Sequence, residues 1–100
     1  MDTKFLEKLR SENGVTLVEM YASWCPHCHN MAPVIDDVKA LMDGKANIYQ
    51  FDIDEYNDLA EQLGARSIPS FYIFKDGEQV WKYTGEIDGN TIVGKLQEYI

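Results

Sequence analysis

The chain has 100 residues, a hydrophobic content of 45% and a formal net charge of −8 at pH 7. A chain of this length can bury about two-thirds of its unfolded surface, so we expect a single domain without a metal or disulfide framework. The dispersed acidic charge disfavours nucleic acids and anionic membranes, which bind clusters of Lys and Arg. With no recognisable signal peptide or membrane span, we expect a cytoplasmic protein, or a periplasmic or extracytoplasmic one if a leader has been removed.

The first half of the chain predicts a short helix, a strand and a longer helix. Apolar residues at helical spacing predict the first helix over residues 3–10. Residues 15–21 are apolar on both parities apart from Thr16 and Glu19, a pattern typical of a central strand covered on both faces. A second helix should begin inside the Cys-x-x-Cys of residues 25–28 and run to about Met42.

The second half predicts three more strands and two more helices. The expected elements are a strand over residues 48–53, a helix over 54–63, strands over 71–74 and 79–84, and a closing helix. Asp76-Gly77 is a favourable two-residue turn, so the last two strands should form an antiparallel hairpin. Asp88 is suited to cap the closing helix, whose core-facing residues should be Ile92, Val93, Leu96 and Ile100. The fold class is therefore α/β, with about four strands in a mixed sheet flanked by helices.

The stretch Trp24-Cys25-Pro26-His27-Cys28 contains both cysteines of the chain and lies at the expected strand-to-helix junction. Disulfide exchange needs a thiolate, which the unsatisfied N–H groups and positive dipole end of a helix start would stabilise at Cys25. Cys28, one turn later, could attack a mixed disulfide on Cys25 and resolve it. Two other interpretations stay open. The pair could form an inert structural disulfide, or it could bind a metal with His27 and His29, although four ligands within five residues suit a tetrahedron poorly.

These features resemble the thioredoxin family over nearly the whole chain. The residues that carry the resemblance are Trp24-Cys25-Pro26-His27-Cys28, Pro33, Ile68-Pro69, Lys75-Asp76-Gly77 and Gly85. The resemblance implies one thioredoxin-like domain over residues 1–100. It also implies a thiol–disulfide oxidoreductase that acts on protein disulfides or dithiols through a reversible disulfide between Cys25 and Cys28.

Three features depart from the common thioredoxin pattern. Only 24 residues precede Cys25, so the usual first strand of the thioredoxin fold is missing from the expected sheet. The dipeptide between the cysteines is Pro26-His27 rather than the Gly-Pro of reductases. The carboxylate six residues before Cys25 is Glu19, as in the protein disulfide isomerase branch of the family, where thioredoxins have Asp.

Pro26 and His27 are expected to tune the redox potential of the cysteine pair. A hydrogen bond or a positive charge from His27 would stabilise the Cys25 thiolate and make the couple more oxidising. A Pro-His dipeptide also resembles that of strong bacterial disulfide oxidants, whose inserted helical domain this chain lacks. We therefore expect a potential more oxidising than that of a typical thioredoxin, while the direction in the cell, reductase or oxidase/isomerase, stays open. The alternative is that His27 points to solvent.

Glu19 is expected to be buried in an otherwise apolar strand, and burial should raise its pKa. The resemblance implies a catalytic role in which Glu19 accepts and returns the Cys28 proton. Gln50 occupies the position of a lysine that the family often pairs with this carboxylate, so Glu19 should be protonated more easily. Alternatively, Glu19 reaches solvent and takes no part in the chemistry.

Ile68, Pro69 and Trp24 are expected to bind the substrate. An X-Pro bond is trans by default, but the resemblance implies a cis Ile68-Pro69 bond that holds Pro69 against the cysteines. The backbone of Ile68 would then face outward and could pair with an extended substrate segment. Trp24 is expected to cover the site and contact the substrate, or else to be a filler of the core.

The resemblance implies no bound cofactor and no metal, because the cysteine pair itself carries two electrons. Expected partners are protein thiol or disulfide substrates and an electron donor or acceptor such as a thioredoxin-reductase-like protein, with no nucleic acid and no membrane. We expect a monomer, unless the missing first strand leaves residues 48–53 as an exposed edge that dimerises. A metal-binding module and a non-catalytic interaction domain stay open as rival functions.

Overall fold

The computed structural model describes residues 4–100. Its elements are α1 (Lys4–Ser11), β1 (Val15–Tyr21), α2 (Pro26–Leu41), β2 (Asn47–Asp52), α3 (Asn57–Leu63), β3 (Ser70–Lys75), β4 (Glu78–Thr84) and α4 (Gly89–Tyr99). This order confirms the predicted sequence of helices and strands, although residue 3, the expected start of the first helix, lies outside the described residues. Across residues 4–100, no helix combines the length and the apolarity needed to cross a membrane.

The strands form one mixed four-stranded sheet in the order β2-β1-β3-β4. β1 pairs parallel with β2, which places Glu19 beside Gln50, and antiparallel with β3. β3 and β4 form the predicted hairpin, with Lys75 opposite Glu78. The turn residues Asp76 and Gly77 have φ values of 49° and 84°, the positive values that a tight two-residue hairpin turn requires. β1 and β3 are therefore the central strands, and β2 and β4 are the edges.

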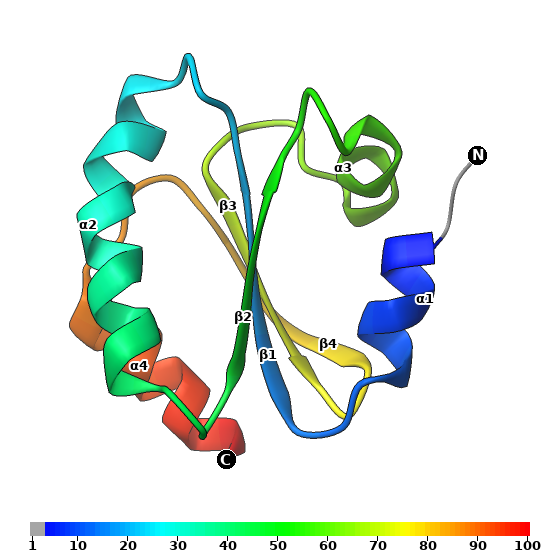
Figure 1. Ribbon diagram of the computed structural model, residues 1–100, viewed down its shortest axis with the longest axis vertical. Coiled ribbons are helices and arrows are strands. Elements are labelled where there is room, and N and C mark those ends of the chain that lie inside the picture. Colours follow the sequence, from blue (N-terminus) through cyan, green and yellow to red (C-terminus); the bar gives the residue numbers. More distant parts are fainter. Residues whose placement is uncertain (1–3) are drawn as a thin grey trace.

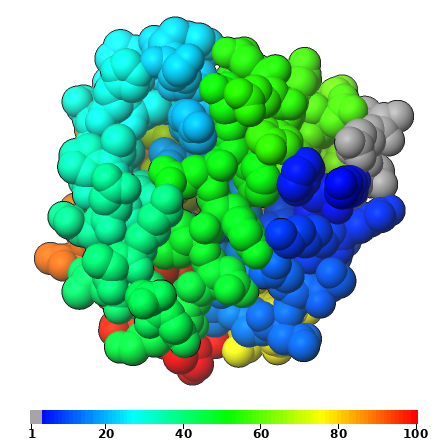
Figure 2. All heavy atoms as spheres, in the orientation of Figure 1, coloured from blue at the N-terminus to red at the C-terminus, as the bar shows by residue number. Residues whose placement is uncertain are grey.

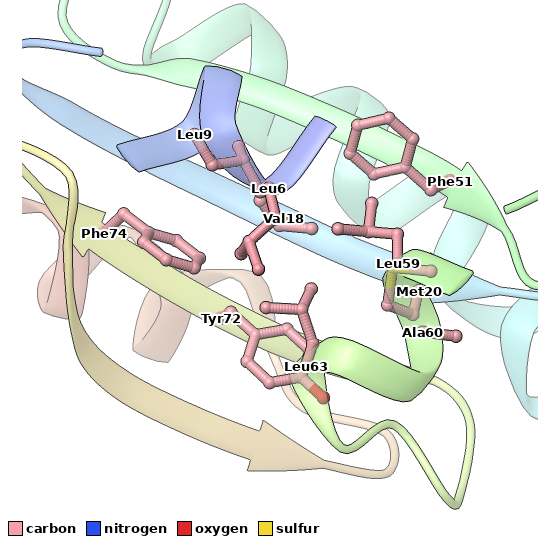
Figure 3. Close-up of a cluster of buried hydrophobic side chains, with 10 residues drawn as sticks. All are labelled: Leu6, Leu9, Val18, Met20, Phe51, Leu59, Ala60, Leu63, Tyr72 and Phe74. Atoms are coloured by element: carbon pink, nitrogen blue, oxygen red, sulfur yellow. The ribbon is translucent and has the colours of Figure 1, made fainter. Parts of the chain in front are cut away.

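Helices cover both faces of the sheet (Figure 1), with α2 and α4 on one face and α1 and α3 on the other. Figure 3 shows the core on the α1 and α3 face, formed by Leu6, Leu9, Val18, Met20, Phe51, Leu59, Ala60, Leu63, Tyr72 and Phe74. The core on the other face consists of Val15, Leu17, Met31, Ile35, Val38, Met42, Phe71, Ile73, Ile92 and Leu96. Each fully buried large apolar side chain stabilises the fold by about 1.5–3 kcal/mol. Because β1 contributes to both cores, it is apolar on both parities.

Two predictions about local structure are wrong. The helix expected from residue 54 begins at Asn57 instead. The Asp52 side chain accepts a hydrogen bond from the Asp54 N–H at 2.8 Å, and the Asp52 carbonyl accepts one from the Tyr56 N–H at 2.8 Å. A turn closed by a hydrogen bond to an Asp side chain competes with the start of a helix at the same residues. Ile100, expected in the core, is exposed because it follows the last residue of α4.

Candidate active site

Cys25 is the N-cap residue of α2 and follows the loop that leaves β1. Its Sγ accepts a hydrogen bond from the Cys28 backbone N–H at 3.2 Å, because the first N–H groups of a helix have no partner within the helix. Pro26 begins α2, where its missing N–H would have had no helical partner. Both cysteines are free thiols, 4% and 5% exposed. The helix start therefore points a donor at the Cys25 sulfur.

The loop before β3 packs against the cysteine pair, and its Ile68–Pro69 peptide bond is cis. The Cys25 thiol lies 3.9 Å from the Ile68 carbonyl oxygen, to which it can donate a weak hydrogen bond. The Ile68 side chain packs against the buried cluster that contains both cysteines. The Pro69 carbonyl accepts a hydrogen bond from the Gly85 N–H at 2.8 Å. The fold thus brings Ile68 to Cys25 across 43 residues of sequence.

Glu19 is only 2% exposed, although it is a carboxylate. Gln50 Nε2 donates a hydrogen bond to Glu19 Oε1 at 2.9 Å, across the pairing of β1 with β2. Burial raises the pKa of Glu19, while the Gln50 hydrogen bond and the Lys39 charge partly offset this rise. Glu19 is therefore a buried acid with a raised pKa, as the strand pattern predicts.

An open cleft of about 280 Å³ reaches both Glu19 and Cys28. It is lined by residues of β1, α2 and β2, including Gln50 and Asp36, and Figure 2 shows the molecule hollowed between α2 and β2. Burial raises the pKa of the Cys28 thiol to about 12, and its hydrogen bond with Cys25 adds to the rise. The cleft thus connects the Cys28 thiol, whose raised pKa disfavours loss of its proton, with the Glu19 carboxylate, which can hold a proton.

Trp24 lies on the surface and is 63% exposed. Its indole Nε1 donates a hydrogen bond to Asp54 Oδ2 at 2.9 Å, which ties the Cys-x-x-Cys loop to the loop between β2 and α3. The interpretation of Trp24 as a core filler is therefore wrong. An exposed indole beside Cys25 in the chain is available for contact with a partner.

Both histidines bond oxygen atoms rather than sulfur. His27 Nδ1 lies 2.5 Å from Glu86 Oε2, so its ring is engaged by Glu86 instead of the expected acceptor, Cys25. His29 Nε2 bonds a backbone carbonyl of the β1–α2 loop. Across residues 4–100, no group of three or more His, Cys, Asp or Glu side chains is placed to hold a metal ion. The metal-binding interpretation therefore gains no geometric support from the described residues.

Sequence analysis missed two carboxylates that bond the Cys-x-x-Cys region, Asp54 and Glu86. Both lie in loops. Asp54 is 30 residues from Trp24 in the sequence, and Glu86 is 59 residues from His27. No spacing rule predicts such contacts, because they depend on how the loops pack. Gly85, which is part of the thioredoxin resemblance, indicated the loop that contains Glu86, but nothing in the sequence indicated a role for the Glu86 side chain.

Comparisons with known proteins place the chain in a family. The sequence model of the thioredoxin family matches residues 1–98. The thioredoxin of Synechocystis is 33% identical over 99 residues, which cover 99% of this chain and 92% of that protein. The thioredoxin of Staphylococcus saprophyticus is 42% identical over 84 residues, or 84% of this chain and 79% of that protein. A mutant thioredoxin from Halobacterium salinarum has a similar structure, with a TM-score of 0.86, 31% identity and coverage of 99% of this chain and 86% of that chain. The chain therefore belongs to the thioredoxin family.

Proposed function

We propose that this protein exchanges the disulfides and dithiols of other proteins through a reversible disulfide between Cys25 and Cys28. Its membership of the thioredoxin family supports thiol–disulfide oxidoreductase activity. The observation that carries the proposal is the 3.2 Å hydrogen bond from the Cys28 N–H to Cys25 Sγ at the start of α2. Such a donor stabilises a thiolate, the form of cysteine that attacks disulfides.

Cys25 is the proposed nucleophile. Its thiolate attacks one sulfur of a substrate disulfide, so that a bond between Cys25 and the substrate forms while the substrate S–S bond breaks. The second substrate sulfur leaves as a thiolate and takes up a proton from water. The Ile68 carbonyl lies 3.9 Å from the attacking sulfur, and the Ile68 backbone beside the cis bond to Pro69 would pair with an extended substrate segment, while Trp24 offers an exposed aromatic surface. Main-chain pairing of this kind admits substrates of different sequence.

Cys28 is the proposed resolving residue, and Glu19 is its proposed base. Burial raises the pKa of the Cys28 thiol above that of an ordinary cysteine, so little of it is ionised at pH 7 and it needs a proton acceptor. Glu19 lines the same cleft, and burial raises its pKa, which suits a group that accepts and returns a proton. As Glu19 takes up the proton through water, the Cys28 sulfur attacks Cys25. The bond between Cys25 and the substrate breaks as the Cys25–Cys28 disulfide forms, and the released substrate thiolate takes up a proton from water. The substrate therefore leaves as a dithiol with two electrons more than it brought.

The oxidised protein needs an electron donor to return to the dithiol form. Thioredoxin-like proteins act on protein disulfides and interact with reductases, which supports a thioredoxin-reductase-like partner. The same steps in reverse would oxidise a substrate dithiol. Although Glu86 engages His27, the Pro26-His27 dipeptide resembles that of strong bacterial disulfide oxidants, and this resemblance supports a couple more oxidising than that of a typical thioredoxin. No cofactor is required, because the cysteine pair carries the electrons.

Replacement of each cysteine tests the mechanism. Cys25→Ser should abolish the reduction of insulin disulfides, because no nucleophile remains. Cys28→Ser should instead accumulate a mixed disulfide with the substrate, detectable by mass spectrometry. Leu41→Ser is the matched control, since it introduces the same residue at an exposed position of α2. Full activity of Cys25→Ser would refute the mechanism.

The proposed potential has its own test. Equilibration of the wild type with glutathione, alongside a thioredoxin that has Gly-Pro between its cysteines, should leave more of this protein in the dithiol form. An equal or lower fraction of dithiol would refute the more oxidising potential but not the exchange chemistry.

A further inference from the structure

Glu86 links the loop between β4 and α4 to the first turn of α2. Its Oε2 lies 2.5 Å from His27 Nδ1 and 3.2 Å from Asn30 Nδ2. His27 and Asn30 are three residues apart, so they lie on the same side of the helix. We call Glu86, His27 and Asn30 the Glu86 clasp. Glu86 thus bonds one of the two residues that separate the cysteines.

The backbone that carries Glu86 is held beside the active site. The Gly85 N–H donates to the Pro69 carbonyl at 2.8 Å, and the Tyr83 hydroxyl donates to the Glu86 carbonyl at 3.3 Å. Gly85 has a φ of +106°, a conformation that residues with a Cβ rarely adopt. The cis-proline loop, which contacts Cys25, therefore also positions the carboxylate that bonds His27.

Two anions compete for the imidazole of His27. One is the Glu86 carboxylate, and the other is the thiolate that forms at Cys25, two residues earlier in the chain. The hydrogen bond from His27 lowers the pKa of Glu86, so this carboxylate is ionised at neutral pH and can only accept. His27 Nδ1 must then carry a proton and donate a hydrogen bond to Glu86. While it does so, this donor is withheld from the sulfur.

We propose that Glu86 is a positioning residue that holds His27 away from the Cys25 sulfur and so limits the oxidising power of the cysteine pair. The inference rests on the proposed function, because it requires a reversible disulfide between Cys25 and Cys28. Removal of the Glu86 carboxylate frees His27 to donate to the Cys25 thiolate. This hydrogen bond stabilises the reduced form, and the couple becomes more oxidising.

The test is the equilibrium of the wild type and of Glu86→Ala with glutathione at pH 7. In this reaction two glutathione thiols reduce the Cys25–Cys28 disulfide, and the products are the protein dithiol and glutathione disulfide. The two protein forms are counted by alkylation of thiols followed by mass spectrometry. Because His27 and Glu86 are 69% and 41% exposed, we expect a moderate shift of about two- to fivefold toward the dithiol. Salt at about 0.15 M screens the direct effect of the lost charge.

Three further variants separate positioning from a loss of charge or of structure. In the His27→Ala background, the addition of Glu86→Ala should retain less than half of the shift, because no imidazole is left to release. Glu86→Gln keeps an acceptor oxygen for His27 and should shift the equilibrium less than Glu86→Ala does. Glu98→Ala removes an equal charge near the end of α4 and should leave the equilibrium unchanged.

The outcomes distinguish this inference from the proposed function. An unchanged or opposite equilibrium in Glu86→Ala would overturn the inference and leave the proposed function intact. A shift in Glu86→Gln as large as that in Glu86→Ala would also overturn the inference. So would a shift in the His27→Ala background, on addition of Glu86→Ala, that is at least half of the shift seen when His27 is present. A wild type that forms no reversible disulfide between Cys25 and Cys28 would overturn the proposed function itself.

Discussion

Glu19→Gln tests whether the buried carboxylate responds to pH as its surroundings require. In the folded protein Glu19 is buried and its pKa is raised, whereas in the unfolded chain its pKa lies near 4.5. The folded state therefore binds the proton more tightly, and ionisation of Glu19 favours unfolding. The contribution of protonated Glu19 to stability is fully present below the unfolded pKa. It is lost as the pH rises from there through the folded pKa, and glutamine at this position removes the loss.

The size of this effect follows from the environment of the carboxylate. Each unit of pKa rise corresponds to about 1.4 kcal/mol of unfolding free energy. A buried polar group with too few hydrogen bonds costs about 1–3 kcal/mol, and Glu19 has one from Gln50. Because the cleft opens beside Glu19, we expect the lower part of this range. Glu19→Gln should therefore add about 1–2 kcal/mol at about pH 8 and little at about pH 4.

Urea unfolding of the reduced proteins, followed by tryptophan fluorescence at several pH values, measures this difference. Gln50→Lys is the matched variant, because a cation beside Glu19 lowers the pKa of the carboxyl and should flatten the pH dependence of stability. A stability difference between Glu19→Gln and the wild type that is the same at both ends of the pH range would refute the reasoning, as would one that shrinks as the pH rises.

The remaining predictions concern packing and backbone conformation. Ile35→Ala should lower the free energy of unfolding by about 2–5 kcal/mol, because Ile35 is fully buried on the core-facing side of α2. Leu41→Ala on the exposed side of the same helix should change it by less than about 0.5 kcal/mol, and similar losses from the two variants would contradict the assigned core. Gly44→Ala, at a φ of +75° with open space around it, should lose about 1–2 kcal/mol from the positive φ alone. Gly77→Ala should lower the free energy of unfolding by clearly more than Gly44→Ala does in the same urea assay, because its Cβ would lie 1.9 Å from the Arg10 carbonyl oxygen. Equal losses of stability in the two variants would show that this contact relaxes freely.

Much of the fold could be predicted from local patterns. β1 was predictable as a central strand because it is apolar on both parities, and the hairpin because Asp76-Gly77 tolerates the positive φ values of its turn. The start of α3 was not predictable from apolar spacing, because a hydrogen bond to the Asp52 side chain favours a turn before the helix. Periodicity reports which residues are buried, and it does not register such competing hydrogen bonds.

For the candidate active site, the sequence alone was enough to predict the proposed reacting atoms. Cys25, Pro26 and Cys28 lie within one turn at the start of a helix, so the hydrogen bond from the Cys28 N–H to the Cys25 sulfur depends on local geometry. Only the tertiary structure decided which groups surround these atoms. His27 bonds Glu86 and Trp24 bonds Asp54, and both acceptors come from distant loops. A side-chain donor selects its acceptor by distance and direction, and these are set only once the loops have packed around the sheet.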